Sequence, residues 1–358
     1  ALGLSTEATI VGDEGLARTL RGRRGLVNDI RFFPQGDRLI TAHSDGACVV
    51  WCAASGQQVR VILHSPDPTA SVYEVRIFPD GVRFVAVGSD MAATIWNATS
   101  GAPLQRLHFR ALGQHHAVRV FPLADKLVTG VTAGDGPAVI WDAAFGHALK
   151  FVGRLDERIV SLELSLCGRK LVTAGSQGVL VWSAATGRMQ LELSRHIGGI
   201  FRVGISADGA HVVGGDRQKL YVWDGRAAEL LREMPVDVGL PVFELLPSRG
   251  RVVVMLRSEA AIFNASSGER LMPLHGDLGG DFQRVAVSRD GQVVAACGAR
   301  ATAESLTAWA AVHDASTGRV LRALNHTIVQ NTWACCVAAS PRGSMLEWLT
   351  RPSSLAAS

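Results

Sequence analysis

Short hydrophobic runs separated by turn residues recur along almost the whole chain. The clearest example is residues 72–107, where the turn segments 79–81, 88–90 and 97–101 separate four such runs. The first two runs are rich in β-branched and aromatic residues and lack the helical period of about 3.6 residues. Proline fixes φ in the first turn and glycine accepts a positive φ, so the chain reverses there. The pattern predicts four short antiparallel strands.

A large side chain marks the third run of each successive unit. The residues at this position are Trp51, Trp96, Trp141, Trp182 and Trp223, followed by Phe263 and His313 in weaker copies. They are separated by 45, 45, 41, 41, 40 and 50 residues. A four-stranded sheet of this size cannot bury both of its faces alone. The repeat therefore predicts an all-β chain that forms a single β-propeller of four-stranded antiparallel blades.

Each end of the chain carries half of a further unit. Ile10 lies 41 residues before Trp51, so residues 7–20 are expected to be third and fourth strands, and 333–350 first and second strands. With seven complete units, this composite predicts eight blades, and the ring closure removes exposed sheet edges. Seven blades is the alternative. The expected units are 27–64, 72–108, 117–152, 158–194, 199–233, 240–275 and 282–325, within a propeller over 1–351 that a tail at 352–358 follows.

The tryptophan-centred repeat resembles that of the WD-repeat β-propeller family. Its motif dipeptides are Trp141-Asp142 and Trp223-Asp224. An aspartate precedes the tryptophan by six or seven residues in four units, at Asp45, Asp90, Asp135 and Asp216. The resemblance implies that a histidine and a second-strand serine or threonine join this aspartate and tryptophan in a hydrogen-bonded set.

Two members of that set depart from the family pattern. Thr41 lies ten residues before Trp51. The residues at the same offset in the next two units are Ala86 and Val131, which have no hydroxyl group. The candidate histidines are His64, His108, His196, His275 and His326, and none of them follows the glycine of the family motif. We therefore expect individual blades to be less rigid, although the spacing still predicts the fold.

The connections between strands vary in length, and loops on a rigid scaffold are the usual carriers of binding. The loops that join fourth to first strands and second to third strands share one rim, which includes a predicted loop at 298–311. This rim is expected to present Arg23, Arg24, His43, Arg110, His115, His116, Arg158, Arg217, Lys219, Arg257 and Arg300. Arginines favour an acidic or phosphorylated partner segment; loop charge that binds nothing specific is the alternative. Trp309 on this rim, and Phe145 in another turn, are candidate hydrophobic anchors.

Charged residues also interrupt the innermost strands. They are Asp29, Arg31, Glu74, Arg76, Arg119, Glu163, Arg202, Glu244 and Arg284. Strand alternation places them on the face opposite Ile30, Val75 and Val118. Because a buried charge needs a partner, neighbouring blades are expected to pair opposite signs around the central channel. A small-anion site in the channel is the alternative.

The sequence contains no recognisable catalytic motif. It lacks His-Glu-x-x-His, Gly-x-x-x-x-Gly-Lys and Gly-x-Ser-x-Gly. His115 and His116 have no further ligand at metal-binding spacing, so no cofactor or metal is expected. Quinoprotein dehydrogenases carry similar Asp-x-x-Thr-Gly turns, but a docking tryptophan follows their glycine and none does here. We predict a non-catalytic scaffold for protein–protein interactions; the alternative is a quinoprotein-like enzyme or small-ligand sensor that uses the channel.

Composition narrows the class of partner. Hydrophobic residues make up 47% and charged residues 19%, which excludes disorder and fits a large core. A net charge of +4 over 358 residues makes nucleic acid an unexpected partner. No hydrophobic run approaches the ~20 residues that span a bilayer, and six cysteines without a Cys-x-x-Cys pair suit a reducing compartment. We expect an intracellular, cytoplasmic protein, with association with the cytoskeleton or cilia as a further option. Its initial alanine indicates a fragment or processed chain.

Overall fold

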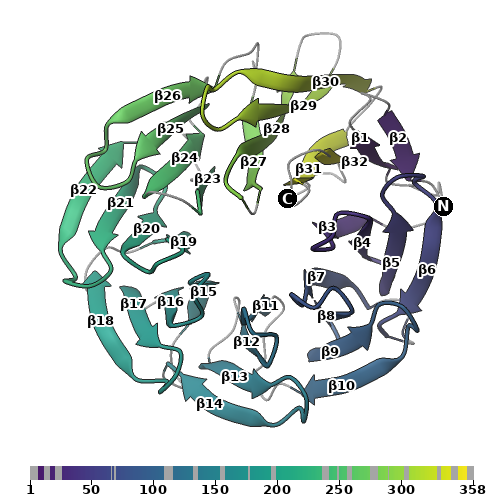
Figure 1. The fold of residues 1–358 in the computed structure, drawn as a ribbon, viewed down its shortest axis with the longest axis horizontal. Helices are drawn as coiled ribbons and strands as arrows, with labels where there is room; N and C mark the ends of the chain where they lie inside the picture. Colours follow the sequence, from purple (N-terminus) through teal and green to yellow (C-terminus); the bar gives the residue numbers. More distant parts are fainter. Residues whose placement is uncertain are drawn as a thin grey trace, which may run out of the picture.

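A computed structural model shows a closed ring of eight four-stranded antiparallel sheets around a central channel (Figure 1). The prediction of a single eight-bladed propeller is therefore confirmed. The structure describes residues 7–11, 17–20, 26–65, 67, 70–108, 116–131, 136–153, 158–175, 178–194, 199–235, 242–247, 250–255, 260–274, 281–288, 290–301, 306–328, 332–339 and 346–352. No helix in these segments is long and hydrophobic enough to cross a membrane.

Blades 1 to 4 follow the chain in order. Blade 1 contains β3 (Val27–Phe32), β4 (Arg38–His43), β5 (Ala47–Cys52) and β6 (Gln58–Leu63). Blade 2 contains β7 (Val72–Ile77), β8 (Arg83–Gly88), β9 (Ala92–Asn97) and β10 (Pro103–His108). Blade 3 contains β11 (His116–Val120), β12 (Lys126–Val131), β13 (Ala138–Asp142) and β14 (Ala148–Val152). Blade 4 contains β15 (Ile159–Leu164), β16 (Lys170–Gly175), β17 (Gly178–Ser183) and β18 (Met189–Ser194).

Blades 5 to 8 complete the ring. Blade 5 contains β19 (Arg202–Ile205), β20 (His211–Gly215), β21 (Lys219–Asp224) and β22 (Leu230–Pro235). Blade 6 contains β23 (Val242–Leu245), β24 (Arg251–Met255), β25 (Ala260–Asn264) and β26 (Arg270–Leu274). Blade 7 contains β27 (Asp281–Val287), β28 (Val293–Ala301), β29 (Leu306–Asp314) and β30 (Val320–Ile328). Blade 8 contains β31 (Thr332–Ala339), β32 (Leu346–Pro352), β1 (Glu7–Val11) and β2 (Ala17–Leu20).

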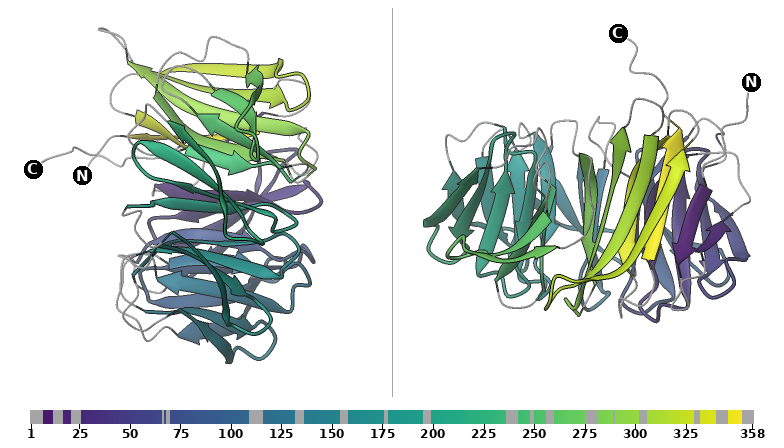
Figure 2. Two further views of the ribbon diagram at one scale, coloured as in Figure 1. Left: turned by 90° about the vertical axis from the view of Figure 1, so that its left-hand side faces the viewer. Right: turned by 90° about the horizontal axis from the view of Figure 1, so that it is seen from above.

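Blade 8 is the predicted composite of the two ends of the chain. Its strand order is β2-β1-β32-β31, and β1 pairs antiparallel with β32 so that Thr9 lies opposite Trp348. The first strand of each blade faces the channel and the fourth forms the circumference (Figure 1). Seen from the side, the ring is a disc whose strands run from one rim to the other (Figure 2).

The hydrophobic core lies between blades, because each sheet buries both faces against its neighbours. The second and third strands of blade 2 are buried at almost every position, whereas β10 is mostly exposed. One cluster joins Ile40 and Val50 of blade 1 to Val75 and Trp96 of blade 2. The tryptophan at the repeat position therefore packs between adjacent blades.

The predicted loop at 298–311 is wrong in part, because β28 and β29 extend into it. Gly298 lies opposite Trp309, and Ala301 lies opposite Leu306. Trp309 is only 4% exposed and packs in the core between blades 6 and 7, so it is not the surface anchor that the sequence predicted. The continued pairing lengthens the hairpin of β28 and β29.

Candidate functional site

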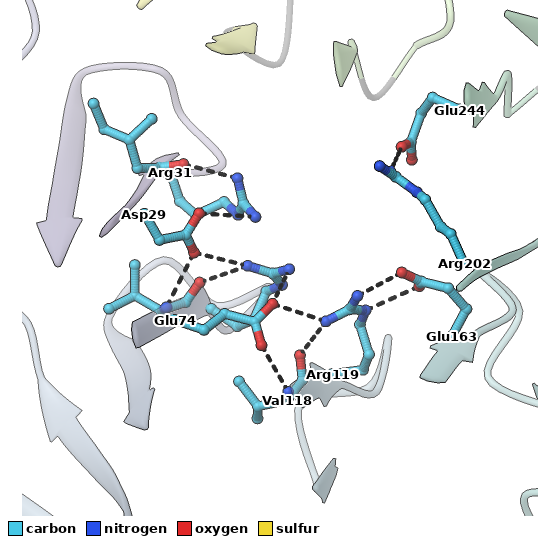
Figure 3. Close-up of polar contacts among 11 residues, drawn as sticks. Asp29, Arg31, Glu74, Val118, Arg119, Glu163, Arg202 and Glu244 are labelled. Atoms are coloured by element: carbon cyan, nitrogen blue, oxygen red, sulfur yellow. Dashed lines mark hydrogen bonds and ion pairs between the residues drawn. The ribbon is translucent and has the colours of Figure 1, made fainter. Parts of the chain in front are cut away.

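The innermost strands of blades 1 and 2 begin a chain of ion pairs along the channel (Figure 3). The Oδ1 of Asp29 lies 3.0 Å from Nη2 of Arg31, and its Oδ2 lies 3.0 Å from Nη1 of Arg76 in the next blade. Arg76 also pairs with Glu74 on its own strand. The pairing of opposite signs that the sequence predicted is confirmed here.

The chain of ion pairs continues into blades 3 and 4. Nη1 of Arg119 donates to Oε1 of Glu74 over 2.9 Å. The Nε and Nη2 of the same guanidinium donate to the two carboxylate oxygens of Glu163, at 2.9 and 2.5 Å. A separate pair joins blades 5 and 6, where Nη2 of Arg202 donates to Oε2 of Glu244 over 2.7 Å. Ion pairs thus link adjacent blades in addition to their side-chain packing.

Polar side chains of the channel also hold backbone groups of the following blade. The Oδ2 of Asp29 accepts the N–H of Val75 over 3.1 Å. The Oε2 of Glu74 accepts the N–H of Val118 over 2.9 Å. In blade 4, the Oγ of Ser161 accepts the N–H of Val203 over 3.2 Å. Such a bond fixes one inner strand against the next at three of the described junctions between blades.

The channel carboxylates have pKa values that move in opposite directions. Burial alone would raise the pKa of Asp29, but the guanidiniums of Arg31, Arg76 and Arg284 outweigh it and hold that pKa below its ordinary value. Burial also opposes ionisation of Glu163, and Arg119 outweighs it, so the pKa is lowered. Burial raises the pKa of Glu244, and the single bond from Arg202 does not compensate. Burial lowers the pKa of Arg76 to about 10.

The contrast between Glu163 and Glu244 gives a testable pH dependence. A lowered pKa means that the Glu163 carboxylate stabilises the fold above its unfolded pKa, near 4.3, and that this contribution disappears as the pH falls through the folded pKa. Glu163→Gln should therefore lower the unfolding free energy at pH 7 by about 1 kcal/mol, reduced from the value for a fully buried pair because Glu163 is partly exposed.

Glu244→Gln should have little effect at pH 7, because a raised pKa shows that the folded state disfavours the ionised form of Glu244. Urea unfolding monitored by tryptophan fluorescence at pH 4, 5.5 and 7 measures both variants. The loss for Glu163→Gln should shrink toward pH 4. Equal losses for the two variants at pH 7 would contradict the opposite pKa directions.

The channel encloses a cavity of about 850 Å³ that these side chains line. Its lining combines five arginines with four carboxylates, which leaves one surplus positive charge among the described residues. Most of the positive charge is thus balanced by carboxylates of adjacent strands. This balance favours a structural role for the ion pairs over the small-anion site that was the alternative.

The tryptophans of three blades donate a hydrogen bond to a threonine of the second strand. The distances from Nε1 to Oγ1 are 2.9 Å for Trp51 and Thr41, 2.8 Å for Trp141 and Thr129, and 2.9 Å for Trp182 and Thr173. The predicted counterpart Val131 is therefore wrong, and Thr129 takes that place. The hydrogen bond between tryptophan and threonine is therefore present in more blades than the fixed offset of ten residues predicted.

Blades 2 and 5 lack this threonine. In blade 2, Ala86 takes its position and the buried Nε1 of Trp96 has no partner. In blade 5 the position is Gly214, and a Cβ there would lie 2.9 Å from Cζ3 of Trp223. The indole of Trp223 thus occupies the space that a threonine would need.

The aspartates and histidines of the repeat also find partners. The Nε2 of His64 lies 3.2 Å from Oδ1 of Asp90, whose Oδ2 pairs with Nη2 of Arg106 at 3.0 Å. In blade 5, the hydroxyl of Tyr221 donates to Oδ2 of Asp216 over 2.9 Å, and burial together with this carboxylate raises the pKa of Tyr221 to about 12. In blade 1, Oδ1 of Asp45 accepts the N–H of Ala47 over 3.3 Å. Asp135 lies outside the described residues.

The structure places only part of the predicted rim set at the surface. His43 is 4% exposed and its Nε2 lies 2.7 Å from Oγ1 of Thr41, so its predicted rim position is wrong. Arg158, Arg217 and Lys219 are exposed, and Lys219 pairs with Glu233 at 2.6 Å. The residues outside the described segments are Arg23, Arg24, Arg110, His115 and Arg257. His116 and Arg300 lie on β11 and β28, and their side chains are not described.

An aromatic residue that the sequence analysis missed lies beside Arg217. The guanidinium carbon of Arg217 is 5.3 Å from the ring centroid of Phe201, which is itself exposed. Phe201 directly precedes β19, and Arg217 lies in the loop between β20 and β21, so both belong to the same rim. The signal in the sequence was the alternation at the start of the strand, where Ile200 is buried and Phe201 points out.

Comparison with known proteins agrees with the repeat. A family model described as "WD domain, G-beta repeat" matches residues 15–52. Guanine nucleotide-binding protein subunits beta from Oryza sativa subsp. indica and subsp. japonica are each 27% identical over 179 residues, and the subunit from Zea mays is 27% identical over 183 residues. Each match covers 47% of this chain and 47% of the relative, so the chain spans about half the length of the curated relatives it matches.

The crystal structure of the computationally designed Ika8 protein has a similar fold. Its TM-score is 0.68 at 19% identity, and the match covers 92% of this chain and 98% of that one. The likeness supports the ring architecture alone. The tryptophan repeat and the eight-bladed ring agree with the match of residues 15–52 to that repeat model.

Proposed function

We propose that the protein is a non-catalytic scaffold that binds segments of partner proteins on the rim that carries Phe201 and Arg217. The relatives it matches are named as subunits of a larger protein, which supports a role in assembly. A rigid ring with variable loops suits this role because the strands fix where the loop side chains lie.

The exposed pair of Phe201 and Arg217 is the observation that carries the proposal. An aromatic face holds a guanidinium in place and leaves its N–H donors at the edge for a carboxylate or phosphate. Aromatic residues and arginine are also the side chains that most often dominate binding energy. An acidic or phosphorylated segment with a hydrophobic residue fits this combination.

Arg217→Glu should weaken binding of acidic and phosphoserine-containing peptides by at least about tenfold, because it reverses the charge of the guanidinium that faces the ligand. Fluorescence anisotropy with peptides in acidic, phosphorylated and neutral forms of one sequence measures the effect. Arg226→Glu is a matched control, since Arg226 is an exposed residue in the turn between β21 and β22 on the opposite rim of the same blade. Equal losses for both variants, or equal affinity for the neutral peptide, would refute rim binding.

A sensor that binds a ligand in the channel is the second candidate function. The cavity of about 850 Å³ and its five arginines are the observation in its favour. The ion pairs that already engage these arginines count against it. Thermal unfolding with sulfate, phosphate and quinone cofactors tests this alternative: a scaffold should show no specific shift in melting temperature.

A further inference from the structure

A row of exposed aromatic and aliphatic side chains lies on the outer edge of blade 3. Phe145 is 75% exposed and Phe151 is 66% exposed, and Leu149 between them is also exposed. The ring of Phe145 stacks on His147, with centroids 6.1 Å apart and planes at 23°. Leu149 and Phe151 lie on β14, whose register shifts between Ala148 and Lys150, and His147 directly precedes the strand. We call these four residues the aromatic edge.

The other blades show that the fold does not require these aromatic residues. The turn position of Phe145 is occupied by Ser55, Ser100, Thr186, Ala227, Ser267 and Thr317 in the six sibling blades whose turn is described. The residue at the register position of Phe151 on the fourth strand is Val61, Arg106, Glu192, Glu233, Pro273 and Ala323 in blades 1, 2, 4, 5, 6 and 7. The fourth strands of other blades also expose single aliphatic residues, among them Leu63, Leu104 and Leu321, so it is the two exposed phenylalanines of blade 3 that call for an explanation outside folding.

The neighbouring turn of blade 3 has the same character. Leu123 is 85% exposed, where the equivalent described turns carry Gln35, Asp80, Cys167, Asp208 and Asp290. Ala124 adopts a φ of 59°, which costs a non-glycine residue about 1 kcal/mol. The N–H of Ala143 donates to the carbonyl of Asp125 over 2.9 Å, which fixes this turn beside the turn that carries Phe145. Leu123 thus extends the aromatic edge onto the adjoining rim.

We propose that the aromatic edge docks an extended peptide segment of a partner protein, with hydrophobic side chains at alternate positions and an acidic residue beside them. β14 is the last strand of its sheet and forms the circumference of the ring (Figure 1). A segment that lies along such a strand presents side chains with the same period of two as Leu149 and Phe151. This surface differs from the rim with Phe201 and Arg217 and goes beyond the scaffold function proposed above.

Area and charge favour a peptide over a second copy of this chain. The exposed parts of Leu123, Phe145, Leu149 and Phe151 amount to roughly 500 Å², whereas a stable interface between folded proteins buries about 800 Å² on each partner. Lys150 lies in β14, and a Cβ on Gly187 of blade 4 would be 3.5 Å from its Cβ. The described ion pairs give neither Lys150 nor the adjacent Arg188 a carboxylate. Alternation places Lys150 on the face opposite Leu149 and Phe151, so these two cations complement an acidic residue at an intervening position of the segment.

The test uses a phage library of random dodecapeptides selected on the wild-type protein and counter-selected on the variant F145S/F151S. Serine already occupies the Phe145 position in three sibling blades, so we expect this variant to fold with an unchanged melting temperature. Selected peptides should carry hydrophobic residues at alternate positions with an acidic residue, and should bind the wild type at least about tenfold more tightly than the variant. The single variant F145S provides the same comparison if the double variant does not fold.

Two controls separate this site from the rest of the molecule. Leu321→Ser removes an exposed leucine from β30, the fourth strand of blade 7, and should leave peptide binding unchanged. Arg217→Glu should also leave it unchanged, which distinguishes failure of this site from failure of the rim proposal. The proposal is overturned if no selected peptide discriminates the wild type from F145S/F151S. It is equally overturned if sedimentation shows a wild-type dimer that the variant loses, because the occupant is then a second copy.

Discussion

Replacing Asp29 with alanine is expected to lower the free energy of unfolding by about 3 kcal/mol at pH 7. Asp29 is 3% exposed and accepts bonds from Arg31, from Arg76 and from the N–H of Val75 in the next blade. Its removal leaves two partly buried guanidiniums and one buried N–H without their shared acceptor, which costs more than the loss of the bonds themselves. Urea unfolding monitored by tryptophan fluorescence measures the change.

Asp29→Asn separates the charge from the hydrogen bonds at this position. The amide oxygen still accepts the N–H of Val75, so the loss should be about half of that for alanine. The pKa of Asp29 is lowered in the folded protein, so the stabilisation by its carboxylate is present above an unfolded pKa of about 3.9 and disappears as the pH falls through the folded pKa. The difference between wild type and Asp29→Asn should therefore shrink below pH 4. An alanine variant as stable as the wild type would show that the ion-pair chain contributes nothing.

The architecture was predictable because one physical requirement repeats. Each blade needs a large side chain to fill the space against its neighbour, and the tryptophans meet that need at regular intervals. The spacing alone also indicated that residues 7–20 belong with 333–350. Their pairing through β1 and β32 satisfies the backbone groups that an open ring would leave exposed.

The hydrogen-bonded sets were harder to predict, because strand register does not follow a fixed offset. The threonine precedes its tryptophan by 10 residues in blade 1, by 12 in blade 3 and by 9 in blade 4. The loop between the second and third strands differs in length, and pairing across the sheet absorbs the difference. An offset of ten therefore identified Val131 and passed over Thr129 and Thr173.

The candidate sites were predictable only where strand alternation decides the answer. Alternation placed the channel charges correctly, since every second residue of an inner strand faces the channel. It did not reveal which carboxylate each arginine reaches, because that depends on the distance between blades. The burial of His43 and Trp309, and the contact of Arg217 with Phe201, arise from residues far apart in the sequence.

The hydrogen bond from Trp182 to Thr173 is expected to contribute strongly to the free energy of unfolding. Thr173→Val keeps the shape of the side chain and removes the acceptor of the indole N–H, which is buried. An unsatisfied buried donor costs about 2 kcal/mol, so the variant should unfold at a correspondingly lower urea concentration with an unchanged dependence on urea. Fluorescence of the tryptophans reports the transition. A variant with wild-type stability would show that the repeat tryptophans stabilise the blades by packing alone.

The same position in two other blades provides controls of opposite sign. Ala86→Thr supplies an acceptor for the unpartnered Nε1 of Trp96 and should raise the unfolding free energy by about 1 kcal/mol. Gly214→Thr should lower it by about 2 kcal/mol, because the indole of Trp223 already fills that space. Threonine is thus expected to stabilise one blade and destabilise another. Equal effects of the two substitutions would show that the position of the indole ring does not decide whether a threonine fits beside it.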